Sequence, residues 1–199
     1  ADQANNPARY ESIAQKMSHS FNFANLETPI DISTERNEHK VFHHCTNYDV
    51  CKQLLLFLNI GCVSLANNHI CDANMPGLRA TIGLLDELGI YHCGAGWKRE
   101  HIEPATFERF GVKIAFLAYV HRSTNPATES FPDLYINYFD PNSIIVDVTK
   151  IRSSVDKVVC SLHWGKDYSN YFSDQQQKDA RRIIDAGADI IMGHHPHTI

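Results

Sequence analysis

The sequence has 199 residues, of which 43% are hydrophobic and 21% are charged, so its composition is that of a globular protein with one sizeable core. Its formal net charge of −5 argues against a protein that mainly binds nucleic acid, because such proteins present a basic surface to the phosphates. Apolar runs such as residues 54–58 are too short to span a bilayer. Because the first residue is Ala1 rather than methionine, the lack of a signal peptide says little about location.

Six cysteines are spread through the chain without a CxxC pair, and several lie in apolar runs typical of strands. In a chain of this length buried thiols are favoured over disulfides, which are concentrated in small secreted scaffolds. This cysteine usage favours a reducing, cytoplasmic environment.

In the first part of the chain, apolar positions at helical spacing predict a helix that includes Tyr10, Ile13 and Met17. The elements expected up to the first buried strand are a helix over residues 7–20, a short strand at 21–25, a polar surface loop at 31–40, a helix at 47–59 and the strand at 62–66.

Strands and helices continue to alternate in the rest of the chain. The expected elements are a helix at 73–89, a strand at 112–120, a long proline-bearing loop at 122–143, a strand at 157–164, a helix at 173–187 and a strand at 189–193. Ser173 and Gln176 are spaced as a capping box, and Gly89 ends its helix. This order predicts a single domain over residues 1–199, an α/β sandwich with a mostly parallel sheet.

Four of the predicted strands have glutamate, asparagine or histidine at or just beyond their carboxyl ends. These residues are Glu27, Asn67, Asn68, His69, His163, His194, His195 and His197. If the strands are parallel, all four groups lie along one edge of the sheet, where open α/β folds build their sites.

Imidazole, carboxylate and amide ligands suit divalent ions of the Zn, Mn or Fe class. Two such ions about 3.5–4 Å apart can hold both the attacking and the leaving oxygen of a displacement at phosphorus. Each group alone has a simpler explanation, because a histidine at a strand end is usually structural, Asn68 can cap a turn and Glu27 can pair with a basic residue. Their coincidence at four strand ends favours a metal site.

The stretches FANLETPI, SLANNHICD, TIGLLDELGIYHCGAG, KIAFLAY, HWGKDY and DAGADIIMGHHPHTI follow one another in this order and cover most of the chain. On these stretches the sequence resembles the CapA family of poly-γ-glutamate capsule biosynthesis proteins, within the calcineurin-like metallophosphoesterase superfamily. The metal ligands that the resemblance implies are Glu27 as a bridging carboxylate, Asn68, His163 and His195 for one ion, and His197 for the second. The resemblance also implies that His69 orients or protonates the leaving group of a phosphoester, and general acid catalysis of this kind lowers the barrier.

The sequence departs from the family pattern at both ends. The pattern begins with a strand that ends in Gly-Asp, whose aspartate binds the first ion, and it continues with further sheet after His197. We therefore expect a domain truncated at both ends, in which Glu27 and His197 alone would hold the second ion, so that metal occupancy is partial and activity is low. Smaller departures are Asn74 in place of a glycine and Asp167 in place of a glutamate. The residues expected to support the ligands or face the substrate, with capping or packing as the alternative, are Asp72, Trp164, Asp167 and Tyr168.

Three functions remain open from the sequence. The first is hydrolysis of a phosphoester by two divalent ions with His69 as the acid. The second, which the family name favours, is an accessory role in which the same fold binds or exports the anionic polymer poly-γ-glutamate without hydrolysis. The third is cleavage of that γ-linked polymer by a metal-activated water. The resemblance also implies an extracytoplasmic protein with a membrane anchor, in conflict with the cysteine usage.

Overall fold

The computed structural model describes residues 11–198, so Tyr10 and the other early residues of the expected first helix lie outside the described range. The helices are α1 (Glu11–Met17), α2 (Tyr48–Phe57), α3 (Asn74–Leu88), α4 (Pro141–Arg152) and α5 (Asp174–Asp185), with the short 3-10 helices η2 (Arg99–Ile102) and η3 (Arg122–Thr124). The strands are β1 (Asn22–Asn25), β2 (Ile60–Ser64), β3 (Tyr91–Cys93), β4 (Ala95–Gly96), β5 (Ala105–Arg109), β6 (Val112–Val120), β7 (Tyr135–Ile136), β8 (Lys157–His163) and β9 (Ile190–His194).

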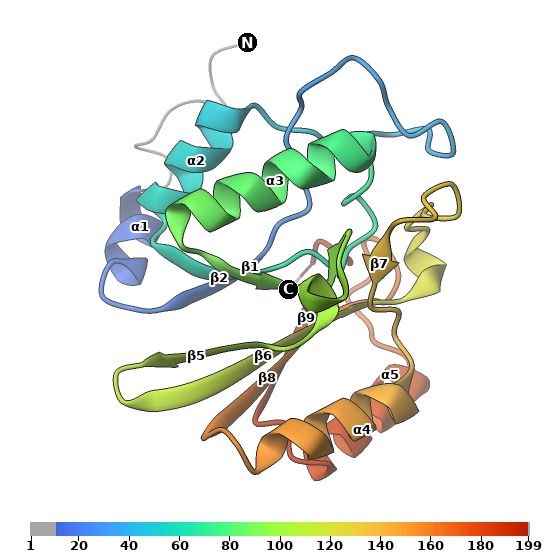
Figure 1. The fold of residues 1–199 in the computed structure, drawn as a ribbon. Helices are drawn as coiled ribbons and strands as arrows, with labels where there is room; N and C mark the ends of the chain where they lie inside the picture. The colour runs from blue at the N-terminus through green and yellow to red at the C-terminus, as the bar shows by residue number, and fades with distance from the viewer. Residues whose placement is uncertain (1–10, 199) are drawn as a thin grey trace.

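Two main sheets lie face to face, with helices on the outside of each (Figure 1). The first is a parallel sheet of three strands in the order β1-β2-β3. The second has four strands in the order β5-β6-β8-β9, in which β6, β8 and β9 are parallel and β5 pairs antiparallel with β6. A small antiparallel pair, β4 with β7, lies beside them. The fold is therefore the α/β sandwich with mostly parallel sheets that the sequence predicts.

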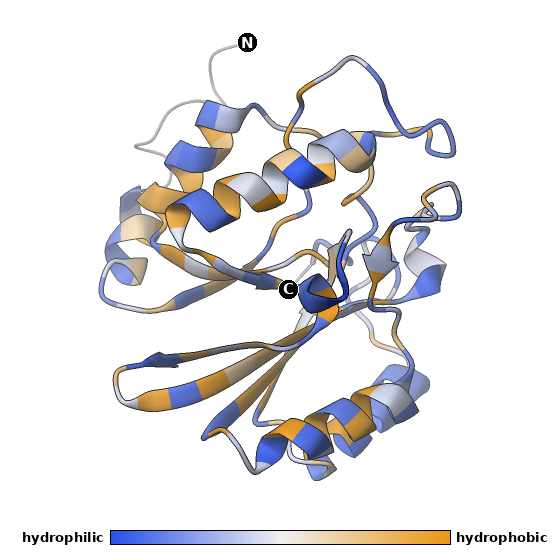
Figure 2. Ribbon diagram, in the orientation of Figure 1, coloured by the Kyte–Doolittle hydropathy of each residue, from blue (hydrophilic) through white to orange (hydrophobic). Residues whose placement is uncertain are grey.

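Successive side chains of β6 point to opposite faces of the second sheet and so contact both neighbouring layers of the sandwich. Phe116 and Ala118 point to the space between the sheets, where they pack with Cys62 of β2 and Val159 of β8. Leu117, between them, points to the other face, which α4 and α5 cover. On the opposite side α2 and α3 cover the first sheet. Figure 2 shows hydrophobic residues along much of β6 and β8, whereas α4 and α5 mix hydrophobic and hydrophilic residues because one face of each meets solvent.

Local signals in the sequence located several helix ends correctly. Ser173 and Gln176 form the reciprocal hydrogen bonds of a capping box at the start of α5. Gly89 ends α3 with a φ of 64°, in the left-handed region that glycine adopts without steric cost. Asn74, which stands where the family pattern has glycine, begins α3 with a φ of 55°, and asparagine tolerates this conformation better than most residues.

The expected long loop at 122–143 is only partly a loop. It contains η3 and β7, and its last residues already belong to α4, which the sequence reading missed. Pro141 occupies the first turn of α4 and Asp140 caps it through the Ser143 amide, so the proline taken as a loop signal is a helix-start signal. The strands β3 and β5 were also missed, since each is short or lies at an edge.

One prediction about the sheet was wrong in detail. The four strand ends expected along one edge belong to two sheets, because β1 and β2 lie in the first sheet and β8 and β9 in the second. The stacking of the sheets nevertheless brings the carboxyl ends of these strands together. Periodicity could not reveal this arrangement, because it shows which residues of a strand are buried but not which strands pair.

All six cysteines are free thiols, five of them buried and Cys45 partly buried. Burial raises the pKa of the Cys51 thiol to about 11, as expected of a thiol that packs as a small hydrophobe. The prediction of thiols rather than disulfides is confirmed. Within residues 11–198, no helix combines the length and hydropathy that crossing a bilayer requires.

Candidate metal centre

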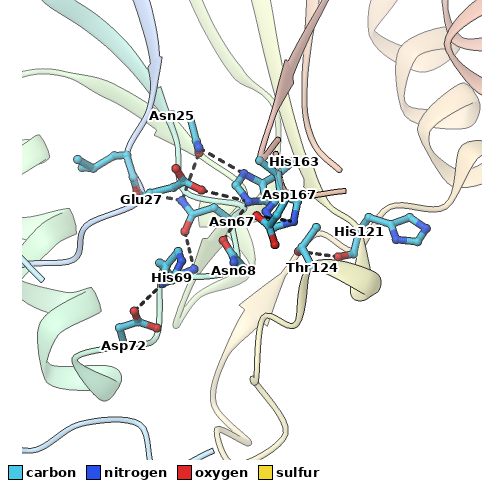
Figure 3. A network of polar contacts seen from close by, with 12 residues as sticks. Asn25, Glu27, Asn67, Asn68, His69, Asp72, His121, Thr124, His163 and Asp167 are labelled. Atoms are coloured by element: carbon cyan, nitrogen blue, oxygen red, sulfur yellow. Dashed lines mark hydrogen bonds and ion pairs between the residues drawn. The ribbon is translucent and has the colours of Figure 1, made fainter. Parts of the chain in front are cut away.

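His163, the last residue of β8, is the centre of the polar cluster between the sheets (Figure 3). Its Nε2 lies 3.0 Å from the amide oxygen of Asn68 and 3.2 Å from a carboxylate oxygen of Glu27. Its Nδ1 lies 3.3 Å from the side-chain nitrogen of Asn25. One imidazole therefore joins groups that follow β1 and β2 in the first sheet to β8 in the second.

His195 completes a cluster of three possible ligands with Glu27 and His163. One ligand atom from each of the three residues lies within 4.8 Å of the other two. His195 and His163 are buried, and their ring centroids are 5.0 Å apart. His195 has a φ of 95°, a conformation that is strained for a residue with a side chain and that is concentrated at functional sites.

Two buried atoms of this cluster have no hydrogen-bond partner: Oε1 of Glu27 and Nδ1 of His195. An unpartnered buried polar atom is costly, and a cation among such atoms would remove that cost. A carboxylate oxygen, two imidazole nitrogens and the nearby amide oxygen of Asn68 form a mixed set that suits Zn, Mn or Fe. These residues therefore fit one divalent ion.

The ionisation of the two histidines agrees with this fit, whereas that of Glu27 depends on the neighbouring charges. Burial lowers the pKa of His163 to about 2, and the neighbouring His195 adds to the effect, so His163 is the neutral imidazole that a metal requires. Burial raises the pKa of the Glu27 carboxyl, against the opposing charges of His197 and His69. Burial also lowers the pKa of His195, although Asp167 acts in the other direction.

His197 lies at the edge of the cluster. It is exposed, and its ring centroid is 6.4 Å from that of His195. Among residues 11–198 only Glu27, His163 and His195 form a group of three or more histidine, cysteine or acidic ligands. A second ion with His197 as its ligand therefore stays a prediction.

His69 is held by the carboxylate of Asp72, which is fully buried. Its Nδ1 lies 2.7 Å from Oδ2 of Asp72. Burial alone would raise the pKa of the Asp72 carboxyl, but hydrogen bonds from His69 and from the His44 amide, with the charge of Lys40, hold that pKa below its ordinary value. Because an ionised carboxylate only accepts, Nδ1 of His69 carries the hydrogen and Nε2 is the nitrogen left for another partner.

The other residues predicted around the site have different surroundings. Asp167 lies on an exposed loop, and its Oδ1 is 3.5 Å from Nε2 of His195. The exposed Tyr168 ring lies 6.0 Å from that of His197. Trp164 is buried and packs on Phe139 in the core beneath α4 and α5, so its placement is that of a packing residue.

Three contacting residues were not predicted as parts of the site. Asn25 ends β1, so the reasoning applied to the other strand ends would have found it. Asn67 was expected only as one of the strand-end residues. Its side-chain amide donates to the backbone oxygen of Leu26 at 2.9 Å and so fixes the backbone next to Glu27. Lys40 lies in the stretch expected to be a surface loop, yet its ammonium reaches Asn68 and Asp72. No local pattern distinguishes it from a solvated lysine.

Comparison with known proteins places the chain among capsule synthesis proteins. The model of the family described as "Bacterial capsule synthesis protein PGA_cap" matches residues 4–199. The chain is 30% identical to the PGA biosynthesis protein CapA of Bacillus subtilis over 178 residues, which are 88% of this chain and 47% of that protein. It is 27% identical to the capsule biosynthesis protein CapA of Bacillus anthracis over 182 residues, 88% of this chain and 44% of that protein. It thus spans about half the length of these relatives.

A more distant relative is a probable polyglutamine synthesis accessory protein of Mycobacterium tuberculosis, 26% identical over 194 residues, which cover 87% of this chain and 48% of that protein. Among solved structures, the 5'-nucleotidase precursor of Thermus thermophilus superposes with a TM-score of 0.53 and 18% identity, over 75% of this chain and 28% of that one. This likeness shows a common fold. With the family match over nearly its whole length, the chain belongs to the PGA_cap family of bacterial capsule synthesis proteins, as the resemblance to CapA predicts.

Proposed function

We propose that this chain carries the metal-binding site of a phosphoester hydrolase that acts in capsule polymer synthesis. The observation that carries the proposal is the convergence of Glu27, His163 and His195 from two sheets, with one buried atom of Glu27 and one of His195 left without a hydrogen-bond partner. A structural cluster would satisfy these atoms within the protein. A divalent ion held there would supply Lewis-acid activation of a phosphoryl oxygen.

The chain's own residues have distinct tasks in this proposal. Glu27, His163 and His195 would hold the ion, with the amide oxygen of Asn68 as a neighbouring ligand. His69, with Nδ1 donated to Asp72, would present Nε2 to the substrate and give a proton to the leaving oxygen. This is the division of roles between metal ligands and acid that the family resemblance implies.

The test uses the chain itself with Mn²⁺ and the substrate bis(4-nitrophenyl) phosphate. We expect wild type to bind Mn²⁺ and to hydrolyse the diester slowly in a metal-dependent manner, and we expect His163→Ala to lose both properties. Metal binding that is equal in wild type and His163→Ala would contradict the site. Metal binding by wild type without turnover of any phosphoester would contradict the hydrolase.

A second candidate is a non-hydrolytic accessory protein that binds poly-γ-glutamate. The printed names of the relatives favour it, since they refer to biosynthesis of the polymer or to an accessory role. Saturable binding of poly-γ-glutamate by the metal-loaded chain, without release of phosphate or shortening of the polymer, would support this candidate. The membrane anchor and extracytoplasmic location stay predictions.

A further inference from the structure

The ammonium group of Lys40 is enclosed beside the candidate site, although Lys40 lies in a loop. Only 7% of its side chain is exposed. Its Nζ lies 2.5 Å from the backbone oxygen of Asn68 and 3.2 Å from Oδ1 of Asp72. Enclosing a lysine is costly unless the ammonium is paired, so this placement requires its partners.

The ammonium group of Lys40 contacts groups of the protein. Nζ also lies 3.2 Å from Nδ1 of His69, but that nitrogen already donates to Asp72 and cannot accept. Lys40 therefore donates to the Asn68 carbonyl and forms an ion pair with the Asp72 carboxylate. One cation contacts the backbone of a candidate metal ligand and the residue that orients the candidate acid.

The loop that carries Lys40 is also hydrogen-bonded to Asp72, in the turn of residues 68–72, at two further points. The amide of Asn37 donates to the backbone oxygen of Asp72 at 3.1 Å, and the amide of His44 donates to Oδ2 of Asp72 at 2.7 Å. Loop residues 37–44 thus surround Asp72. The Lys40 contact is the one that reaches past Asp72 to Asn68.

We propose that Lys40 is a positioning residue of the candidate metal centre, whose ammonium fixes the turn of Asn68–Asp72 so that the Asn68 amide and the His69 imidazole point into the site. This inference rests on the proposed function for the role of Asn68 as a ligand. It does not require contact between Lys40 and the substrate.

The variant Lys40→Met tests the proposal, because methionine keeps a long apolar stem and removes the charge. Asp72 keeps its bonds from His69 and His44 in this variant, so we expect it to fold. Lys40→Arg keeps the cation. The matched control is Lys52→Met on α2, which removes an exposed ion pair with Glu87 outside the site.

Two readouts are measured, the dissociation constant for Mn²⁺ by calorimetry and the hydrogen exchange of the His69 and Asp72 amides, which bond within the turn. We expect Lys40→Met to weaken Mn²⁺ binding about tenfold, as loss of a residue that orients a ligand does, and to speed exchange of both amides. Lys40→Arg should lie between Lys40→Met and wild type, and Lys52→Met should match wild type.

The outcomes separate this proposal from the proposed function. Unchanged Mn²⁺ affinity in Lys40→Met overturns the proposal, whether or not exchange rises, because the ligand would then be positioned without Lys40. If wild type binds no Mn²⁺, the metal function fails, and amide exchange alone decides whether Lys40 fixes the turn. Faster amide exchange in Lys40→Met but not in Lys52→Met supports the role of Lys40 in fixing the turn. Equal exchange in all variants overturns that role.

Discussion

The imidazole Nε2 of His163 and the amide oxygen of Asn68 lie 3.0 Å apart, although the two residues are 95 positions apart in the chain. His163 ends β8 of the second sheet, and Asn68 follows β2 of the first. Without a cation, Nε2 donates its hydrogen to Asn68. A cation bound through Nε2 must replace this hydrogen, so the protein's internal hydrogen bond competes with the metal. Substitutions of the residues around this contact therefore test metal affinity and the stability of the site.

Replacing His195 should weaken metal binding, whereas the same change at its neighbour His194 should not. We expect His195→Asn to weaken Co²⁺ binding at least about tenfold, since one of three clustered ligands is lost. His194→Asn is the matched control, because His194 precedes His195 and is not one of the clustered ligands. Titration followed by Co²⁺ absorption measures both. Equal affinities would remove His195 from the site.

Asn25 should control which nitrogen of His163 carries the hydrogen. Its side-chain nitrogen faces Nδ1 of His163 at 3.3 Å, which leaves the hydrogen on Nε2, the nitrogen that faces Glu27 and Asn68. Metal binding through Nε2 moves the hydrogen to Nδ1, and the Asn25 amide must then turn to accept it with its oxygen.

We therefore expect Asn25→Asp, which only accepts, to bind Co²⁺ more tightly than Asn25→Leu, by about tenfold. Nitrogen NMR of the His163 ring reports the tautomer directly. A metal-free ring with the hydrogen already on Nδ1 would contradict the assignment.

Removing the charge of Asp72 should destabilise the protein strongly. Asp72→Asn leaves the enclosed ammonium of Lys40 without its carboxylate, and breaking a buried ion pair from one side typically costs about 3–5 kcal/mol. Asp86→Asn is a suitable control because Asp86 is largely exposed and its ion pair is with His92, outside the site. Urea unfolding of both variants measures the free energies. A loss below about 1 kcal/mol in Asp72→Asn would show that the pair contributes no more than a surface pair.

The stability of the metal-free protein should fall as the pH drops below about 6.5. Burial lowers the pKa of His163 from 6.5 to about 2, so the folded state keeps this imidazole neutral while the unfolded chain binds a proton. The contribution of His163 is therefore fully present above pH 6.5 and is lost progressively as the pH falls toward 2.

Thermal unfolding between pH 7.5 and 5 in the presence of EDTA measures this dependence. His163→Gln should show a shallower fall in the unfolding midpoint than wild type. Parallel curves for the two proteins would show that His163 titrates alike in both states.

The elements that the sequence predicted best are those with local signals. The capping box of Ser173 and Gln176 and the left-handed Gly89 depend on residues close in the chain, so their patterns suffice. The helix α4 was missed because proline is common both in loops and in the first turn of a helix, so Pro141 did not distinguish the two. Short edge strands such as β3 bury too few residues to leave a periodic signal.

The sequence by itself determined the family, the α/β class and the residues that stand after the strands, because ligand chemistry and strand ends are properties of short segments. The tertiary structure alone decided that two stacked sheets bring Glu27, His163 and His195 together and that Lys40, in a polar loop, has its charge enclosed beside Asp72. The physical reason is that pairing between distant strands and burial of a loop side chain depend on packing of the whole domain, which no local pattern records.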